Sequence, residues 1–290
     1  MFLQNTLKSK TSLSGVGLHS GKEVSVNFLP ATVDTGICFV RADLPKRPCV
    51  RLEAHKVKST ELATTLDFGD YKISTVEHCL AALYAMGVDN LYIEVFGEEM
   101  PILDGSSKVF VQAFKKAEVL EQNKVKPYVC VQKEFTEKLG SSYAKVEPYN
   151  GLRISCNIDF PHPKILKQSL DLEIDSHSFD TEIAGARTFG FIEQVEQLKK
   201  QGLVLGGSLD NAIVLTPTGI LNQEGLRFSD EFVRHKILDA LGDLAILGRP
   251  LLAQITLYKP GHALMNQLLQ RLLALPAFYD IKERAGALKF

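Results

Sequence analysis

Short segments of two kinds alternate along this chain, and that alternation is the strongest constraint on its fold. In residues 23–28 and 90–95, polar and apolar side chains alternate one by one, which is the period of a half-buried strand. Residues 128–131 and 152–158 have the same strand character in the second half. Helix-like segments lie between these strands in both halves. The sequence therefore predicts an α+β fold, with a helix layer on each mainly antiparallel or mixed sheet.

Helix signals are clearest at residues 74–87. Ser74 and Glu77 have the spacing of an S-x-x-E capping box, apolar residues follow at helical spacing, and Gly87 stands where a C-terminal cap belongs. Four further helices are predicted, at residues 109–119, 191–201, 229–247 and 262–274.

A polar stretch separates the two halves. Residues 121–127 lack periodicity and end in Pro127, a helix breaker. At roughly 150 residues per domain, a chain of 290 residues accommodates two domains. We therefore expect two similar α+β domains, at residues 1–124 and 127–290, with their helices packed between them.

Composition excludes several classes of protein. Lys and Arg number 33 and Asp and Glu 34, so no net positive field attracts nucleic acid or an anionic membrane. Hydrophobic residues make up 45% and charged residues 23%, which excludes a disordered chain. The five cysteines form no C-x-x-C pair, which favours a reducing compartment. Residues 1–8 lack a signal-peptide pattern, so we expect a cytoplasmic protein without stable membrane insertion.

One segment carries several metal-ligating residue types. At about 100° per residue, His235, Asp239 and Asp243 fall within one helical stripe of about 80°, opposite an apolar face. A His and an Asp four residues apart can hold one divalent metal ion, but a catalytic zinc site needs a third protein ligand. The alternative is that this stripe is the solvated face of an amphipathic helix, with His235 and Asp239 as an ordinary i,i+4 pair.

Two more histidines are candidates for catalysis. His78 follows Glu77, a pairing that would place a general base beside a metal ion; the alternative is a capping glutamate next to an ordinary histidine. His262 stands where a turn enters a helix, an exposed place suited to proton transfer, or else it is a helix-terminal residue without function. The glycine-rich residues 15–21 and 206–208 complete no phosphate-loop motif and are more simply turns.

Together these segments resemble the UDP-3-O-acyl-N-acetylglucosamine deacetylase family, the zinc amidohydrolases of early lipid A synthesis. The resemblance spans nearly the whole chain and rests on collinear motifs at residues 15–21, 73–78, 101–106, 186–191, 206–208, 226–236 and 259–262. It implies that His78, His235 and Asp239 hold Zn(2+) between the two domains, which supplies the missing third ligand. Such a site also accepts Fe(2+).

The resemblance also implies roles for the residues around the metal. Glu77 is expected to act as the general base, and His262 as the acid that protonates the departing amine. Asp243 is expected to orient the catalytic imidazole, and Thr188 to hydrogen-bond to the oxyanion. The residues expected to contact the substrate are Lys236, Phe160, Phe189, Phe191, Leu18 and Gly207.

The implied reaction hydrolyses the N-acetyl group of UDP-3-O-(3-hydroxyacyl)-N-acetylglucosamine, the committed step of lipid A biosynthesis in Gram-negative bacteria. It gives UDP-3-O-acyl-glucosamine and acetate without an organic cofactor. An insert at about residues 188–210 is expected to enclose the acyl chain, and the family leads us to expect a monomer. Thr65 stands where some relatives carry a cysteine near the metal, so we expect a different response to excess zinc.

Two other classes of function remain open. One is a metal-independent enzyme acting on acyl chains, a dehydratase or transferase, which would keep an apolar pocket but would not need His78 or Asp239. The other is a noncatalytic protein that binds a sugar nucleotide without releasing acetate.

Overall fold

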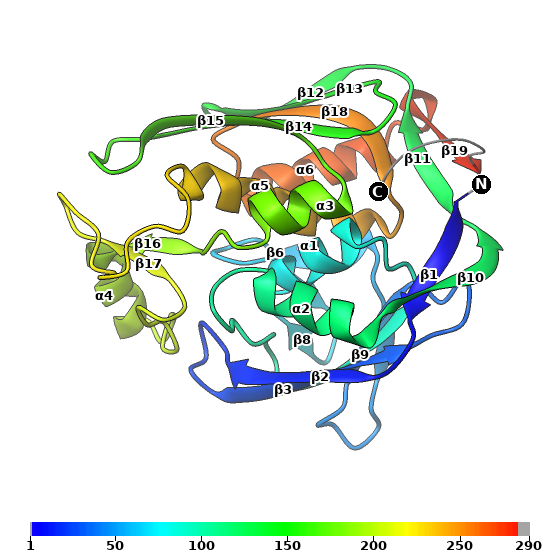
Figure 1. The fold of residues 1–290 in the computed structure, drawn as a ribbon, viewed down its shortest axis with the longest axis horizontal. Coiled ribbons are helices and arrows are strands. Elements are labelled where there is room, and N and C mark those ends of the chain that lie inside the picture. The colour runs from blue at the N-terminus through cyan, green and yellow to red at the C-terminus, as the bar shows by residue number, and fades with distance from the viewer. Residues whose placement is uncertain (1, 284–290) are drawn as a thin grey trace.

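Two sheets enclose a layer of helices (Figure 1). The structure, a computed structural model, describes residues 2–283 apart from the side chain of Lys58. The first sheet has the strand order β2-β3-β9-β4-β5. Its strands are β2 (Thr11–Val16), β3 (Glu23–Pro30), β9 (Leu91–Phe96), β4 (Ile37–Arg41) and β5 (Cys49–Arg51).

Alternation along the central strands produces the buried face of this sheet. β3 buries Val24, Val26 and Phe28, and it pairs antiparallel with β9. These are the strands predicted at residues 23–28 and 90–95, and both are confirmed. The sheet is mixed, because β4 runs parallel to β9.

The second sheet is built around β18 (Leu251–Tyr258), which pairs in parallel with β11 and β14 and antiparallel with β13. The strands predicted at residues 128–131 and 152–158 are confirmed as β11 and β14. Besides β18, the sheet contains β11 (Pro127–Val131), β12 (Phe135–Leu139), β13 (Ser142–Glu147), β14 (Leu152–Phe160), β15 (Leu166–Glu173) and β19 (Tyr279–Glu283).

The remaining strands form one small sheet and two separate pairs. A three-stranded sheet is formed by β6 (Val57–Ser59), β7 (Thr65–Asp67) and β8 (Lys72–Ile73). Two pairs of strands are β1 (Leu3–Leu7) with β10 (Val119–Val125), and β16 (Phe189–Phe191) with β17 (Ile213–Leu215).

The helices are α1 (Glu77–Ala85), α2 (Lys108–Ala117), α3 (Ser176–Ser178), α4 (Ile192–Lys200), α5 (Glu231–Leu244) and α6 (His262–Leu273). Single helical turns occur at Ala54–Lys56, Phe179–Ile183, Ala245–Leu247 and Pro276–Phe278. All five predicted helices are confirmed, with ends that shift by up to three residues. Within residues 2–283, no helix is long and apolar enough to cross a membrane.

The predicted capping box at the start of α1 is wrong. Val76 occupies the N-cap position and no side chain caps the helix. The Ser74 hydroxyl donates to the carbonyl of Glu98 instead, and Thr75 adopts a positive φ of 57° while its hydroxyl donates to Glu99. Tertiary partners have therefore replaced the local cap, and the carboxylate of Glu77 is released for another role.

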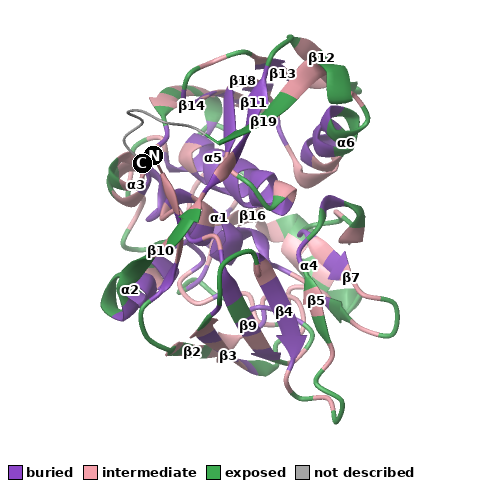
Figure 2. Cartoon of the chain, turned by 90° about the vertical axis from the view of Figure 1, so that its right-hand side faces the viewer, coloured by how far each residue is buried: buried purple, intermediate pink, exposed green. Residues whose placement is uncertain are grey.

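The helices α1 and α5 pack against each other at the centre of the molecule, where Figure 2 shows both as buried. Gly242 makes this approach possible, because a Cβ there would lie 2.1 Å from the carbonyl oxygen of Glu77. The polar stripe of α5 is buried as well: His235 is 2% exposed, Asp239 6% and Asp243 2%. The solvated-face interpretation is therefore wrong, since α1 covers that side of the helix.

The polar stretch at residues 121–127 is not an irregular linker. Most of it belongs to β10, which pairs with β1, and β11 begins at Pro127. Strand pairing explains why the segment is ordered although it lacks an apolar face. The division into domains at residues 1–124 and 127–290 remains a proposal.

Candidate functional site

Two helices from different halves of the chain bring three metal-ligating side chains together. His78 lies in the first turn of α1, and His235 and Asp239 lie one turn apart on α5. Asp239 Oδ1 is 3.6 Å from His78 Nε2 and 3.3 Å from His235 Nε2. One ligand atom from each residue lies within 4.8 Å of the others. Two ligands of a tetrahedral zinc ion lie about 3.3 Å apart, so the spacing fits such a site.

The donor atoms also have the protonation that a metal site requires. His235 Nδ1 lies 3.1 Å from the carbonyl oxygen of Ala186, so Nδ1 carries the proton and Nε2 turns its lone pair toward Asp239. Burial lowers the pKa of His235 to about 3, which keeps this imidazole neutral. Asp239 Oδ1, the oxygen that Nε2 of both histidines approaches, is buried without a hydrogen-bond partner among the described residues. Lone pairs that face one another are stabilised by a cation, so these residues fit a divalent metal ion.

A positively charged imidazole lies beside this group. His262 Nδ1 is 2.9 Å from Asp243 Oδ2, and its Nε2 is 3.9 Å from Glu77 Oε1. Burial alone would lower the pKa of His262, but the carboxylates of Asp243 and Glu77 outweigh burial and raise it to about 10. His262 is therefore a cation at neutral pH and can donate a proton. Its side chain is only 11% exposed, so the expected exposed location is wrong; α6 packs against α5.

Glu77 has the properties of a general base. Burial raises the pKa of its carboxyl group, and the neighbouring His262 and His78 limit that rise. Its Oε2 accepts a hydrogen bond from the backbone N–H of Thr64 at 3.1 Å, while Oε1 lies nearest to His262. A carboxylate with a raised pKa accepts a proton more readily near neutral pH.

Thr64 belongs to this site although the sequence analysis did not identify it. Its hydroxyl donates to Asp243 Oδ1 at 2.6 Å and lies 3.3 Å from His262 Nδ1. The residue precedes β7 and contacts groups that follow it by 179 and 198 positions. No local pattern carries a signal for such contacts, because they depend on how the two halves pack.

Lys236 connects the metal ligands to the neighbouring cavity. Its Nζ donates to Asp239 Oδ2 at 3.0 Å and lies 5.5 Å from the ring centroid of Phe189. Burial alone would lower the pKa of Lys236, but Asp239 outweighs burial and raises it. The ammonium group is therefore charged and suited to an anionic substrate group.

A cavity of about 350 Å³ lies between α4 and the pair β16–β17. Five of the predicted residues line it, namely Leu18, Thr188, Phe189, Phe191 and Gly207. Most of the remaining wall is aliphatic, from residues such as Ile192, Val195, Leu198, Val204, Val214 and Leu221. The cavity is therefore suited to an apolar chain.

Aromatic rings join this cavity to the metal ligands. The ring of Phe189 lies 6.2 Å from that of His235, and the ring of Phe160 lies 5.7 Å from Phe189 and 6.1 Å from Phe191. Thr188 enters the wall beside them, and its backbone N–H donates to the carbonyl of Gly105 at 2.8 Å. The predicted contact residues thus form one continuous region.

His19 is a second residue that the sequence analysis did not assign to the site. It lines the cavity beside Leu18, and burial lowers the pKa of its imidazole. Neither ring nitrogen has a hydrogen-bond partner within the described part of the chain. The sequence signal that could have identified His19 was its position within the glycine-rich residues 15–21.

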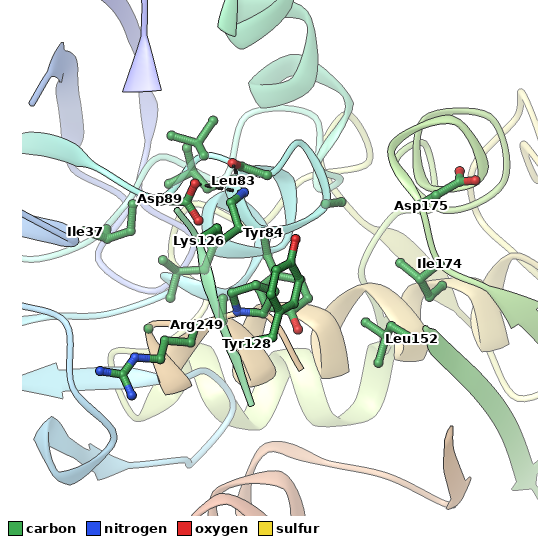
Figure 3. Close-up of a pocket in the computed structure, with 17 residues that line it drawn as sticks. Ile37, Leu83, Tyr84, Asp89, Lys126, Tyr128, Leu152, Ile174, Asp175 and Arg249 are labelled. Carbon is green, nitrogen blue, oxygen red and sulfur yellow. Dashed lines mark hydrogen bonds and ion pairs between the residues drawn. The ribbon is translucent and has the colours of Figure 1, made fainter. Parts of the chain in front are cut away.

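A separate cavity of about 50 Å³ contains none of the predicted residues (Figure 3). It lies on the face of α1 opposite His78, where Leu83 and Tyr84 approach Tyr128 of β11. Lys126 in its wall forms an ion pair with Asp89 at 2.8 Å. The chemistry-bearing side chains therefore gather at the metal-ligand group and the larger cavity.

This arrangement combines three residues that could hold a metal ion, a buried carboxylate that can accept a proton, a cationic imidazole that can donate one, and an apolar cavity. Metal, base and acid together are the requirements for metal-assisted hydrolysis of an amide or ester. The apolar cavity indicates that the substrate carries an apolar chain.

Comparisons with known proteins agree with this chemistry. Residues 4–274 match the family described as UDP-3-O-acyl N-acetylglycosamine deacetylase. A UDP-3-O-acyl-N-acetylglucosamine deacetylase from Bdellovibrio bacteriovorus is 46% identical over 279 residues, which cover 96% of this chain and 92% of the relative. The enzyme of the same name from Myxococcus xanthus is 47% identical over 278 residues, covering 96% and 88%. The chain belongs to the UDP-3-O-acyl N-acetylglycosamine deacetylase family.

Proposed function

We propose that this chain removes the N-acetyl group of UDP-3-O-acyl-N-acetylglucosamine by zinc-dependent hydrolysis, using His78, His235 and Asp239 as ligands. The observation that carries the proposal is the convergence of these three buried side chains from α1 and α5 on one point. The names of the two relatives supply the substrate. Because a two-His, one-Asp set also accepts Fe(2+), the choice of zinc rests on the family.

A bound zinc ion would supply Lewis acidity to the amide carbonyl and lower the pKa of a water molecule. Glu77 takes the proton of the attacking water on Oε1, the oxygen that faces His262. His262 then donates the proton on Nε2 to the departing amine, while Asp243 holds its Nδ1. Base and acid thus act from opposite sides of one gap, which allows both proton transfers in a single active site.

The remaining residues orient the substrate in this proposal. Lys236 neutralises an anionic group of the sugar nucleotide, and the rings of Phe160 and Phe189 offer a stacking surface beside it. The Thr188 hydroxyl hydrogen-bonds to the oxyanion. The cavity lined by Leu18, Phe191, Gly207 and α4 takes the acyl chain, which makes residues 188–210 the enclosing insert.

Three broader proposals accompany this one. The chain forms two domains, at residues 1–124 and 127–290, with the active site between them. It acts as a monomer. Within residues 2–283 the cysteines form no disulfide bond, which supports a reducing compartment and hence the cytoplasm as its location.

The test is acetate release from UDP-3-O-acyl-N-acetylglucosamine after chelation and graded return of zinc. We expect activity to rise with bound zinc up to about one ion per chain. His78→Ala should lose both zinc and activity, whereas His55→Ala, at an exposed histidine, should keep both. Full activity of metal-free wild type would contradict the proposal and favour the metal-independent acyl-chain enzyme. Substrate binding without acetate release would favour the noncatalytic sugar-nucleotide-binding protein.

A further inference from the structure

Thr64 lies between the acid and the base of the proposed reaction. It is 1% exposed and belongs to the loop before β7, in the first half of the chain. Its hydroxyl contacts Asp243 and His262, which come from the second half, and its backbone contacts Glu77. Thr64 thus hydrogen-bonds both to Glu77 and to Asp243.

The Thr64 hydroxyl helps Asp243 to hold the proton on Nδ1 of His262. A carboxylate only accepts hydrogen bonds, so the single hydroxyl proton goes to Asp243 Oδ1 at 2.6 Å. The hydroxyl oxygen then has only lone pairs for His262 Nδ1, which lies 3.3 Å away. His262 Nδ1 faces two acceptors, this oxygen and Asp243 Oδ2 at 2.9 Å, and must therefore keep its proton. The proton that His262 exchanges is consequently the one on Nε2.

The backbone of Thr64 acts on the base in the same way. Its N–H donates to Glu77 Oε2 at 3.1 Å. That bond occupies one oxygen of the carboxylate and leaves Oε1 facing His262 Nε2 at 3.9 Å. One residue thus holds the two reacting atoms, Oε1 and Nε2, toward each other.

We propose that Thr64 is a positioning residue that aligns the acid and the base across the junction of the two halves. This inference rests on the proposed function, because it assigns the proton transfers to Glu77 and His262. The hydroxyl and the backbone N–H make separate contributions, so a side-chain substitution tests the hydroxyl alone.

The first test compares Thr64→Ser, which keeps the hydroxyl, with Thr64→Val, which replaces it by a methyl group of similar size. We expect Thr64→Val to lower kcat about 10- to 100-fold with KM changed less than about twofold, because Thr64 orients reacting groups and does not touch the substrate. Thr64→Ser should stay within about threefold of wild type. Thr136→Val, at an exposed threonine of β12, is the matched control and should retain wild-type kcat.

The second test does not require activity. In the metal-free protein with ¹⁵N-labelled histidine, we expect His262 of wild type and Thr64→Ser to show a proton held on Nδ1, seen as a slowly exchanging signal. In Thr64→Val that signal should broaden, because one of its two acceptors is gone. Thr64→Ala, which removes the hydroxyl without adding bulk beside Asp243, serves as the second variant if Thr64→Val does not fold.

The outcomes distinguish a failure of the Thr64 positioning role from a failure of the proposed function. Equal kcat and equal Nδ1 signals in wild type, Thr64→Ser and the hydroxyl-free variants would overturn the positioning role. An equal loss of kcat in Thr64→Ser and Thr64→Val would also overturn it, since packing and not the hydroxyl would then be responsible. If wild type released no acetate at all, the proposed function would fail, while the Nδ1 signal would still decide the role of Thr64.

Discussion

At the scale of single residues, the charge on His262 depends on two buried carboxylates. Asp243 and Glu77 flank its two ring nitrogens and overcome the effect of burial, which by itself would remove the proton. The raised pKa, about 10 against about 6.5 in an unfolded chain, keeps this imidazole protonated at neutral pH, as the proposed acid role requires.

Asp243→Asn should lower the pKa of His262, because the nearest negative charge is lost. The direct measurement is NMR titration of the His262 ring in the metal-free protein, with a midpoint near pH 10 in wild type and a lower one in the variant. Asp171→Asn, which disrupts the distant pair with Arg153, is the control. An unchanged His262 midpoint in Asp243→Asn would contradict this account of the acid.

The raised pKa of His262 also makes the stability of the fold depend on pH. Since the folded pKa of His262 lies above the unfolded value, protonation stabilises the fold fully below about pH 6.5, and this contribution disappears as the pH rises toward 10. The free-energy difference of unfolding between wild type and Asp243→Asn should therefore narrow over that window. Urea unfolding at several pH values measures it.

At the scale of elements, the packing of α1 on α5 builds the site. The ligand of α1 can meet the ligands of α5 only because the helix backbones approach closely at Gly242. The same contact buries one side of α5 that a lone amphipathic helix would expose to water. The distance between α1 and α5 therefore sets the distances between the candidate metal ligands.

Gly242→Ala should separate the two helices, since its Cβ would lie 2.1 Å from the carbonyl oxygen of Glu77. We expect a loss of about 1–3 kcal/mol in the free energy of unfolding, or more, together with weaker zinc binding. Gly185→Ala is the matched control: this buried glycine has its nearest neighbour atom, on the ring of Phe228, at an ordinary 3.4 Å. Urea titration measures the stability of the two variants, and metal analysis measures their zinc content. A stable Gly242→Ala protein with full zinc affinity would show that the helix approach is not needed.

At the scale of the whole molecule, the two halves share one core. Buried apolar residues of both halves form a single contiguous cluster. Direct contacts cross between them away from the metal ligands: the Tyr84 hydroxyl accepts from the backbone N–H of Leu251 at 2.8 Å, and Arg227 pairs with Asp104 at 2.8 Å. The halves are therefore expected to unfold together.

Tyr84→Phe should lower the stability of the entire molecule by about 1–3 kcal/mol, because the buried N–H of Leu251 loses its acceptor. Far-UV circular dichroism and tyrosine fluorescence should report one coincident transition that shifts as a unit; the chain has no tryptophan. Tyr143→Phe, at a half-buried residue stacked on Tyr258, should leave the midpoint unchanged. Two separate transitions would show that the halves fold independently.

Local sequence patterns were sufficient to predict features that depend on a single helix or strand. Period-two alternation located β3 and β9, and helical spacing located α5 with His235 and Asp239 on one side. The family motifs added His78 and led us to expect a metal site. By contrast, the capping box at Ser74 and Glu77 did not form, because the Ser74 hydroxyl donates to the carbonyl of Glu98 and the Glu77 carboxylate accepts from the backbone N–H of Thr64.

The sequence by itself determined the α+β class, the positions of the main helices and strands, and the family, and it singled out the three residues now proposed as metal ligands. These properties follow from short-range periodicity or from motifs that are read in order along the chain. Only the tertiary structure decided that the stripe of α5 is buried, that His262 is enclosed and charged, and that Thr64 joins the acid to the base. The physical reason is that burial and hydrogen bonding depend on partners far away in the sequence, and packing alone brings those partners within reach.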